Sequence, residues 1–141
     1  MTASVQELSD RLEIDDLLVA YAHAVDRHRW DDLDDVFTAD AVIDYRAMGG
    51  IRGTLPEIKR FLDTSMAAFP RSHHLIASSR VELAGDTATA VSMCHNPMVR
   101  EVDGVEDVMT CALWYHDDLV RTDRGWRMSS RTTERVAIQN P

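Results

Sequence analysis

Tyr21, Asp26, Tyr45 and His74 come from three separate parts of the sequence, but their side chains are of the types that move protons between carbon and oxygen. A carboxylate beside an imidazole fixes the ring's tautomer and raises its basicity, so that the ring can act as a general base. Phenolic hydroxyls can donate hydrogen bonds to an oxygen atom that gains negative charge. Together in one apolar cavity, these groups could remove a proton next to a carbonyl group.

Asp26 stands at the end of an apolar helical segment, which is an unfavourable place for a negative charge. The helix macrodipole disfavours an anion there by about 0.3–1 kcal/mol. We therefore expect a compensating partner for Asp26, and His74 is the candidate. The alternative, from the residues alone, is that Asp26 caps a surface turn into Arg27 and His28.

Two adjacent histidines, His73 and His74, could face the cavity from the first long β-run. Strict alternation places His73 on the more apolar face of such a strand. That face also carries Leu75, Ala77, Val81 and Leu83. A bulge in an edge strand would reverse this parity. Alternation thus favours His73 as the histidine that faces the cavity, and His74 remains the alternative.

The two tyrosines have a structural alternative, since each could be an ordinary core residue. A buried phenol needs a hydrogen-bond partner, and in a pocket that partner can be a substrate carbonyl or a leaving hydroxyl. Arg131 and Arg135, on the expected last strand, could bind a substrate carboxylate or oxyanion, with a solvated surface position as the alternative. His95 and His116 fall on central strands and could line the pocket, or be structural histidines.

No spacing of histidines, cysteines or carboxylates matches a metal site, and no phosphate-binding loop, dinucleotide fingerprint or nucleophile elbow occurs. We therefore expect no metal and no organic cofactor. The formal net charge of −9 argues against nucleic acid or an anionic membrane surface as the main partner. No apolar run approaches the ~18 residues that a membrane span needs.

The chain is ordinary for a globular protein, with 45% apolar residues, and its 141 residues are enough for one domain spanning positions 1–141. The first residues are neither basic nor apolar enough for an export signal. Cys94 and Cys111 lack a CxxC spacing, and we interpret them as free, buried thiols in a reducing compartment. We expect a cytoplasmic protein.

The N-terminal half predicts helices. Ser4-x-x-Glu7 is a capping box that opens a long helix, and Thr54-x-Pro56-Glu57 is a second one with proline in its first turn. Residues 31–37 predict a short helix between them, and 41–45 a first short strand. The inward face of the first helix carries Ile14, Leu17, Leu18, Tyr21, Ala22 and Val25.

After Pro70 the apolar period changes to two, which predicts strands near 73–83, 87–98, 108–121 and 126–138. Helices followed by a meander of antiparallel strands indicate an α+β fold. Each helix has one apolar face, so we expect the N-terminal helices to pack on one face of a curved, mostly antiparallel sheet. This cone-shaped α+β barrel would enclose a pocket.

The chain resembles the SnoaL-like branch of the nuclear transport factor 2-like superfamily over essentially its whole length. The resemblance rests on residues 11–18 with Tyr21, Ala22 and Asp26, on Trp30, Asp31 and 37–41, on Gly53 and Ile58, and on 74–76, 85–88 and 125–127. The pocket pattern is similar to that of bile acid 7α-dehydratase and scytalone dehydratase, which have a tyrosine where Tyr45 stands. Hexachlorocyclohexane dehydrochlorinase is similar in pairing an aspartate with a histidine at the position of His74. An asparagine often found four residues later is Ser78 here.

The resemblance implies an Asp26–His74 pair that removes a proton during an elimination, with no metal or organic cofactor. We therefore expect a dehydratase-type lyase or an isomerase that acts on a hydrophobic polycyclic or terpenoid-like hydroxy-ketone. The resemblance also implies a homodimer joined through the outer sheet face. The alternatives are a protein that binds a small hydrophobic molecule without chemistry, and the small subunit of a ring-hydroxylating dioxygenase.

Overall fold

The first helix begins and ends where the sequence signals predict. The structure, a computed structural model, describes residues 2–141. Helix α1 (Val5–Asp26) starts with the predicted capping box, in which the Ser4 hydroxyl accepts from the Glu7 N–H at 3.1 Å and Glu7 Oε2 accepts from the Ser4 N–H at 2.7 Å. Its last residue is Asp26. None of the helices within residues 2–141 is long and apolar enough to cross a membrane.

The segment after α1 differs from the prediction. The helix expected over 31–37 is a short 3-10 turn, η1 (Trp30–Asp35), and strand β1 (Phe37–Asp44) starts four residues earlier than the predicted strand. Phe37 is buried and is already paired with strand β7, which explains why tertiary contacts extend the strand here. Tyr45 therefore lies just beyond the end of β1, and its N–H donates to the Ile51 carbonyl at 2.8 Å.

The second capping box is also present. A turn, η2 (Arg46–Met48), leads into β2 (Arg52–Thr54), and helix α2 (Leu55–Ser65) follows with Pro56 in its first turn. Glu57 accepts hydrogen bonds from the N–H and the hydroxyl of Thr54. After α2 the chain forms the short 3-10 turn η3 (Met66–Ala68) and a two-residue strand, β3 (Arg71–Ser72). The sequence did not predict this strand.

Four long strands form the rest of the chain: β4 (Leu75–Ala84), β5 (Thr87–Val102), β6 (Val105–Thr122) and β7 (Gly125–Gln139). The sheet has the order β2-β1-β7-β6-β5-β3, and β4 also pairs with β5. All pairs are antiparallel except β1 with β7. At the β5–β6 turn, Asp103 and Gly104 both have positive φ, as a tight two-residue hairpin requires.

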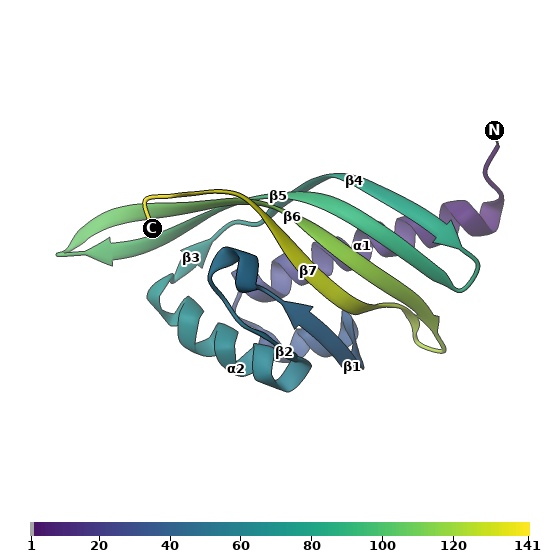
Figure 1. Cartoon of the computed structure of the whole chain (residues 1–141), viewed down its shortest axis with the longest axis horizontal. Coiled ribbons are helices and arrows are strands. Elements are labelled where there is room, and N and C mark those ends of the chain that lie inside the picture. The colour runs from purple at the N-terminus through teal and green to yellow at the C-terminus, as the bar shows by residue number, and fades with distance from the viewer. Residues whose placement is uncertain (1) are drawn as a thin grey trace.

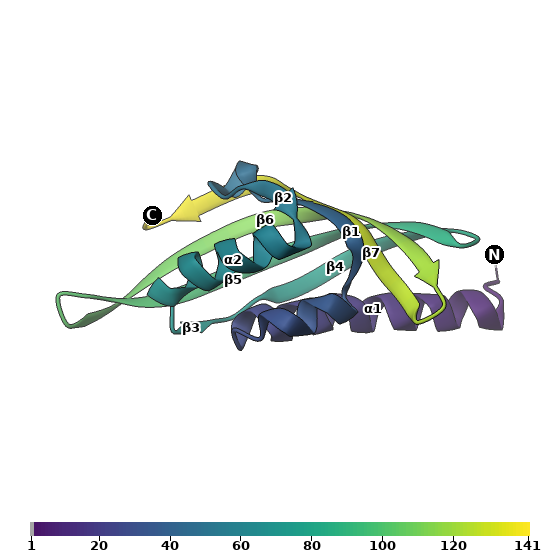
Figure 2. The same cartoon turned by 90° about the horizontal axis from the view of Figure 1, so that it is seen from below.

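Both long helices lie on the same side of the curved sheet, α1 along β4 and β7 and α2 near β1 and β2 (Figure 1, Figure 2). The β5–β6 hairpin extends beyond the end of the helices (Figure 2). The inward face predicted for α1 is buried against the sheet. The predicted α+β cone is thus confirmed, and its interior lies between the two helices and the concave face of the sheet.

A buried charge fixes the N-terminal half of α1 to the sheet. Asp10 accepts two hydrogen bonds from Arg121, at 2.7 and 2.8 Å, and a third from the indole N–H of Trp126 at 3.1 Å. The hydrogen bond from Arg121 lowers the pKa of Asp10 well below its usual range, although burial of the carboxyl opposes the shift. Asp10 therefore stabilises the fold in its ionised form.

Replacing Asp10 with Asn should lower the free energy of unfolding by about 1–3 kcal/mol at neutral pH, because Arg121 loses a charged partner. A depressed pKa in the folded state stabilises the protein above the unfolded pKa of about 3.9. The difference between wild type and Asp10→Asn should therefore shrink as the pH falls below about 4. Urea denaturation at several pH values measures this, with exposed Asp16→Asn as the control. An equal effect of both substitutions would contradict it.

Candidate active site

Asp26 and His74 are in direct contact. The Nδ1 atom of His74 lies 2.6 Å from Asp26 Oδ1, and the backbone N–H of His74 donates to Oδ2 at 2.9 Å. The hydroxyl of Ser72 donates to Oδ1 at 2.8 Å. Three hydrogen bonds thus join the last residue of α1 to the end of β3 and to His74, which precedes β4. The pairing of Asp26 with His74 that the sequence analysis expected is present in the fold.

The charge on Asp26 determines which nitrogen of His74 carries the proton. Burial acts to raise the pKa of Asp26, but the hydrogen bonds and charge of His74, with help from Ser72, outweigh it and lower the pKa below its usual value. The carboxylate is therefore ionised at neutral pH and can only accept. Nδ1 of His74 must be the donor, and in the neutral form of the ring the lone pair is then on Nε2.

His74, and not His73, faces the interior. The side chain of His74 is 5% exposed, whereas the neighbouring His73 is an exposed residue. The register of β4 with β5 shifts between Ala77 and Arg80, and Ser78 has a φ of 51°. The bulge explains why His74 points inward although simple alternation favoured His73. Even-numbered residues point inward before the bulge, and odd-numbered residues such as the buried Val81 point inward after it.

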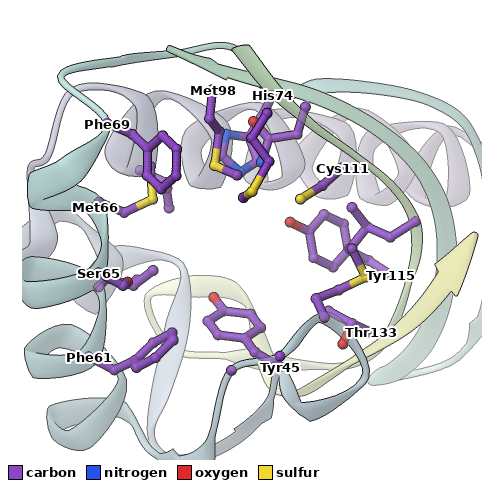
Figure 3. A pocket seen from close by; sticks show the side chains of 18 of the residues that line it. Tyr45, Phe61, Ser65, Met66, Phe69, His74, Met98, Cys111, Tyr115 and Thr133 are labelled. Carbon is purple, nitrogen blue, oxygen red and sulfur yellow. The ribbon is translucent and has the colours of Figure 1, made fainter. Parts of the chain in front are cut away.

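The concave side of the cone contains a cavity of about 260 Å³ beside this pair. Its walls come from α1, α2, the loop after β1 and the central strands. The wall is formed by Tyr21, Val25, Tyr45, Met48, Gly49, Gly50, Phe61, Leu62, Ser65, Met66, Phe69, His74, Asn96, Met98, Met109, Cys111, Leu113, Tyr115 and Thr133. All three tyrosines of the chain are among these residues. In Figure 3, Tyr45 lies on one side of the cavity and His74 on the opposite side.

Tyr21 and Tyr45 meet at their hydroxyl groups, which are 2.6 Å apart. Tyr21 comes from α1 and Tyr45 from the loop after β1, and both side chains are buried. Burial raises the pKa of Tyr45 well above 10, and the neighbouring Tyr21 adds to the increase. Tyr45 therefore remains a neutral hydrogen-bond donor. The ring of Tyr21 also packs edge-on against His74, with 6.2 Å between the ring centroids.

Arg131 is a correction to the sequence analysis, which expected it to be solvated or to bind substrate. It is fully buried, and its guanidinium donates two hydrogen bonds to Asp117, at 2.7 and 2.8 Å. It lies between the rings of Tyr21 and Tyr115, 4.1 and 3.8 Å from their centroids. It is outside the cavity lining. Since a desolvated arginine needs its counter-ion, Arg131 is committed to Asp117 and supports the tyrosines from behind.

His95 and His116 are also corrections, because both are exposed on the outer face of the sheet. Cys94 and Asn96 point inward on β5, so His95 must point outward. His116 contacts Glu134 at 2.7 Å, away from the cavity. Neither histidine can reach a ligand inside the cone.

Arg135 has an intermediate position. It pairs with the cavity residue Leu113, but its own side chain is exposed and outside the cavity lining. Its charge acts to lower the pKa of the Cys111 thiol, although burial outweighs this and raises that pKa. Arg135 therefore lies near the cavity without forming its wall. Cys94 and Cys111 are both free and buried, as predicted.

The site contains polar residues that the sequence did not predict: Ser72 beside Asp26, and Ser65, Asn96, Tyr115 and Thr133 in the cavity wall. Ser72 stands in the unpredicted strand β3. Tyr115 and Asn96 are on predicted strands, and the period of two could have placed Tyr115 on the inward face with Leu113. Within residues 2–141, no group of three or more histidines, cysteines or carboxylates could hold a metal ion.

Residues 6–132 match the model of the SnoaL-like domain family. The chain belongs to this family. The uncharacterized protein Rv2910c of Mycobacterium tuberculosis (strain H37Rv) is a relative, with 52% identity over 128 residues that cover 91% of this chain and 86% of that protein.

The SnoaL-like domain has the nuclear transport factor 2-like fold. A nuclear transport factor 2-like protein of Salmonella enterica serovar Typhimurium superimposes with a TM-score of 0.78 at 16% identity, covering 94% of each chain. A type 2 hexachlorocyclohexane dehydrochlorinase (LinA) superimposes with a TM-score of 0.83 at 18% identity, covering 97% of this chain and 92% of that one. At 16% and 18% identity, these superpositions show that the chains share a fold, and they show no more than that.

If His74 lowers the pKa of Asp26, then His74→Phe should raise it, because the Nδ1–H donor is lost while the burial remains. NMR titration of the side-chain carboxyl carbons measures the shift. His73→Phe is the matched control, since His73 is exposed, and should leave the pKa of Asp26 unchanged. An equal response to the two substitutions would show that the pair does not exist in solution.

Proposed function

We propose that this SnoaL-like protein is a cofactor-independent lyase or isomerase that removes a proton next to a ketone in a small hydrophobic molecule. The observation that carries the proposal is the His74 ring, whose Nδ1 is held by Asp26 while Nε2 is free at the wall of an apolar cavity. An imidazole in this arrangement is poised to act as a general base.

In the proposed dehydration, Nε2 of His74 takes the proton from the carbon next to the carbonyl, and the bonding electrons move toward the carbonyl oxygen. Asp26 stabilises the imidazolium that results. When the enolate collapses, the bond to the β-hydroxyl breaks, and the hydroxyl leaves as water with the proton from His74. Return of that proton to another carbon would instead give an isomerase.

The paired tyrosines can stabilise the enolate oxygen. Tyr21 and Tyr45 together have two hydroxyl hydrogens, and the bond between them uses one. Whichever hydroxyl accepts in that bond keeps its own hydrogen, which it can donate to a ligand. Such a preorganised donor in a water-excluded site stabilises developing negative charge more strongly than water does.

The size and lining of the cavity define the class of substrate. About 260 Å³ is slightly below the range of ~300–1,000 Å³ typical of sites for drug-sized ligands. The many methionines and phenylalanines of the wall give an adaptable apolar surface. A hydroxy-ketone with one or two rings fits this description better than a larger polycycle. Arg135, near the cavity, could contact an acidic group at the outer end of such a molecule.

The dehydrochlorinase with the same cone supports an elimination, since its name describes the removal of hydrogen and chloride from a cyclic molecule. The competing function is ligand binding without chemistry. It would explain the cavity but would not need an ionised carboxylate that orients a histidine. The Asp26–His74 contact therefore favours the lyase.

The proposal includes a homodimer joined through the outer face of the sheet. Leu75 and Met93 expose apolar side chains on the outer side of β4 and β5 (57% and 40% exposed). A second copy packed there would leave the cavity open. The cytoplasm, where thiols stay reduced, is the proposed location and suits the free Cys94 and Cys111.

Benzylacetone and its β-hydroxy derivative, with the hydroxyl on the benzylic carbon, test the proposed base. The protein should exchange the protons next to the ketone of benzylacetone with solvent deuterium, and should convert the hydroxy derivative to benzylideneacetone. Asp26→Asn and His74→Phe should each slow both reactions by about 10²–10⁴-fold. His73→Phe is the control and should keep wild-type rates, since its side chain is on the outside. Full turnover by Asp26→Asn would exclude the mechanism.

The phenol donors can be tested separately. Tyr45→Phe should reduce the rate of elimination by about 10²–10³-fold, because it removes a donor to the enolate. Because burial raises the pKa of Tyr45 well above 10, the wild-type rate should show no loss from ionisation of this phenol up to about pH 10. A pH–rate profile measures this. A decline between pH 8 and 10 that disappears in Tyr45→Phe would contradict the assignment.

A further inference from the structure

Asn96, on β5, is a buried amide whose oxygen has no hydrogen-bond partner among residues 2–141. Only 6% of the residue is exposed, and it forms part of the cavity wall. Its inward neighbours on the same strand, Cys94 and Met98, are apolar and buried. A leucine of similar size would satisfy this position without leaving an acceptor unpaired. The amide therefore needs a reason other than packing.

The strand register places Asn96 next to the proposed base. Ser72 pairs with Met98, and Leu75 pairs with His95. The same register brings His74 directly opposite Asn96, although the two are not themselves a ladder pair. Side chains in such positions have Cβ atoms about 4.5–5.5 Å apart. Both residues line the cavity, so a molecule bound there would lie against the two side chains.

Several polar groups at or near this wall are bonded within the protein. Nδ1 of His74 is bound to Asp26, and the hydroxyls of Tyr21 and Tyr45 bind each other. Ser92, two inward positions before Asn96 on β5, is bonded to Ser79 and lies outside the cavity. Asn96 differs from these residues, because no protein group in the described part of the chain donates a hydrogen bond to its amide oxygen. It also forms part of the wall that a bound ligand would touch.

We propose that Asn96 is a specificity-determining residue, whose amide oxygen accepts a hydrogen bond from a hydroxyl group of the substrate beside His74. This inference rests on the proposed function and defines its substrate further, as a molecule that carries the hydroxyl close to the carbon that loses its proton. A site that hydrogen-bonds a hydroxyl disfavours an analogue without it, because the buried acceptor is then left unpaired. A dehydrated product lacks that hydroxyl, so Asn96 also favours its release.

The test compares the binding of two ketones that differ only in the hydroxyl, the β-hydroxy derivative of benzylacetone and benzylacetone itself. Both are titrated by NMR into the slow variant Asp26→Asn, so that turnover does not change the ligand. We expect the hydroxy-ketone to bind about 10-fold more tightly, as one satisfied hydrogen bond predicts. Adding Asn96→Leu should abolish this preference by weakening the hydroxy-ketone alone.

The matched control is Ser92→Ala, which replaces a polar inward residue on the same strand outside the cavity and should keep the preference. Asn96→Leu should melt at the same temperature as its parent or higher, because it removes an unpaired buried acceptor. If Asn96→Leu does not fold, Asn96→Ala gives the same comparison. Equal binding of the two ketones before the substitution, an unchanged preference after it, or no binding of either ketone would overturn the assignment.

The same measurements separate this inference from the proposed function. A preference for the hydroxy-ketone that depends on Asn96, without any elimination or deuterium exchange by the wild type, would leave Asn96 as a ligand-specificity residue and remove the lyase. Elimination that depends on His74, without a hydroxyl preference, would keep the lyase and exclude the role of Asn96.

Discussion

The carboxylate of Asp26 is the point on which the arrangement of the site depends. It sits at the end of α1, where the helix dipole disfavours a negative charge. Three hydrogen bonds from Ser72 and His74 offset that cost. Ser72 is the last residue of β3, and His74 comes directly before β4. Their hydrogen bonds to Asp26 therefore fix both the path of the chain between these strands and the orientation of the imidazole. Folding and the placement of the proposed base are therefore not separable at Asp26.

A second buried charge shapes the opposite part of the interior. Arg131 and Asp117 are both buried, side by side on neighbouring strands, and the guanidinium lies between the rings of Tyr21 and Tyr115. Burying such an ion pair costs free energy unless its geometry is good. Replacing one of the two residues would leave the other as an uncompensated buried charge. The pair fixes the tyrosine rings from behind while their hydroxyls face the cavity. The positive charge also acts to lower the pKa of Tyr45, though burial and Tyr21 dominate.

These two charged clusters leave the cavity itself with few unpaired polar groups. Its wall is mostly apolar, and the polar atoms that remain free are concentrated around Nε2 of His74, the tyrosine pair and the amide of Asn96. An unpaired buried acceptor lowers stability, and such local conflicts between packing and polarity are expected where a protein binds or converts a ligand. The stable parts of the fold, including the Asp10–Arg121 contact, lie toward the other end of α1.

The sequence by itself determined the local elements: two capping boxes, the long strands and their turns, and hence the α+β cone. These signals are local, because a cap or a two-residue period acts through neighbours in the chain. The tertiary structure alone decided the parity at His74, since the bulge near Ser78 reverses the alternation that favoured His73. It also decided the burial of Arg131 against Asp117, the start of β1 at Phe37, and the place of Tyr115 and Asn96 in the cavity wall. Each of these depends on which distant strand lies alongside, and strand pairing is a long-range property that no local pattern specifies.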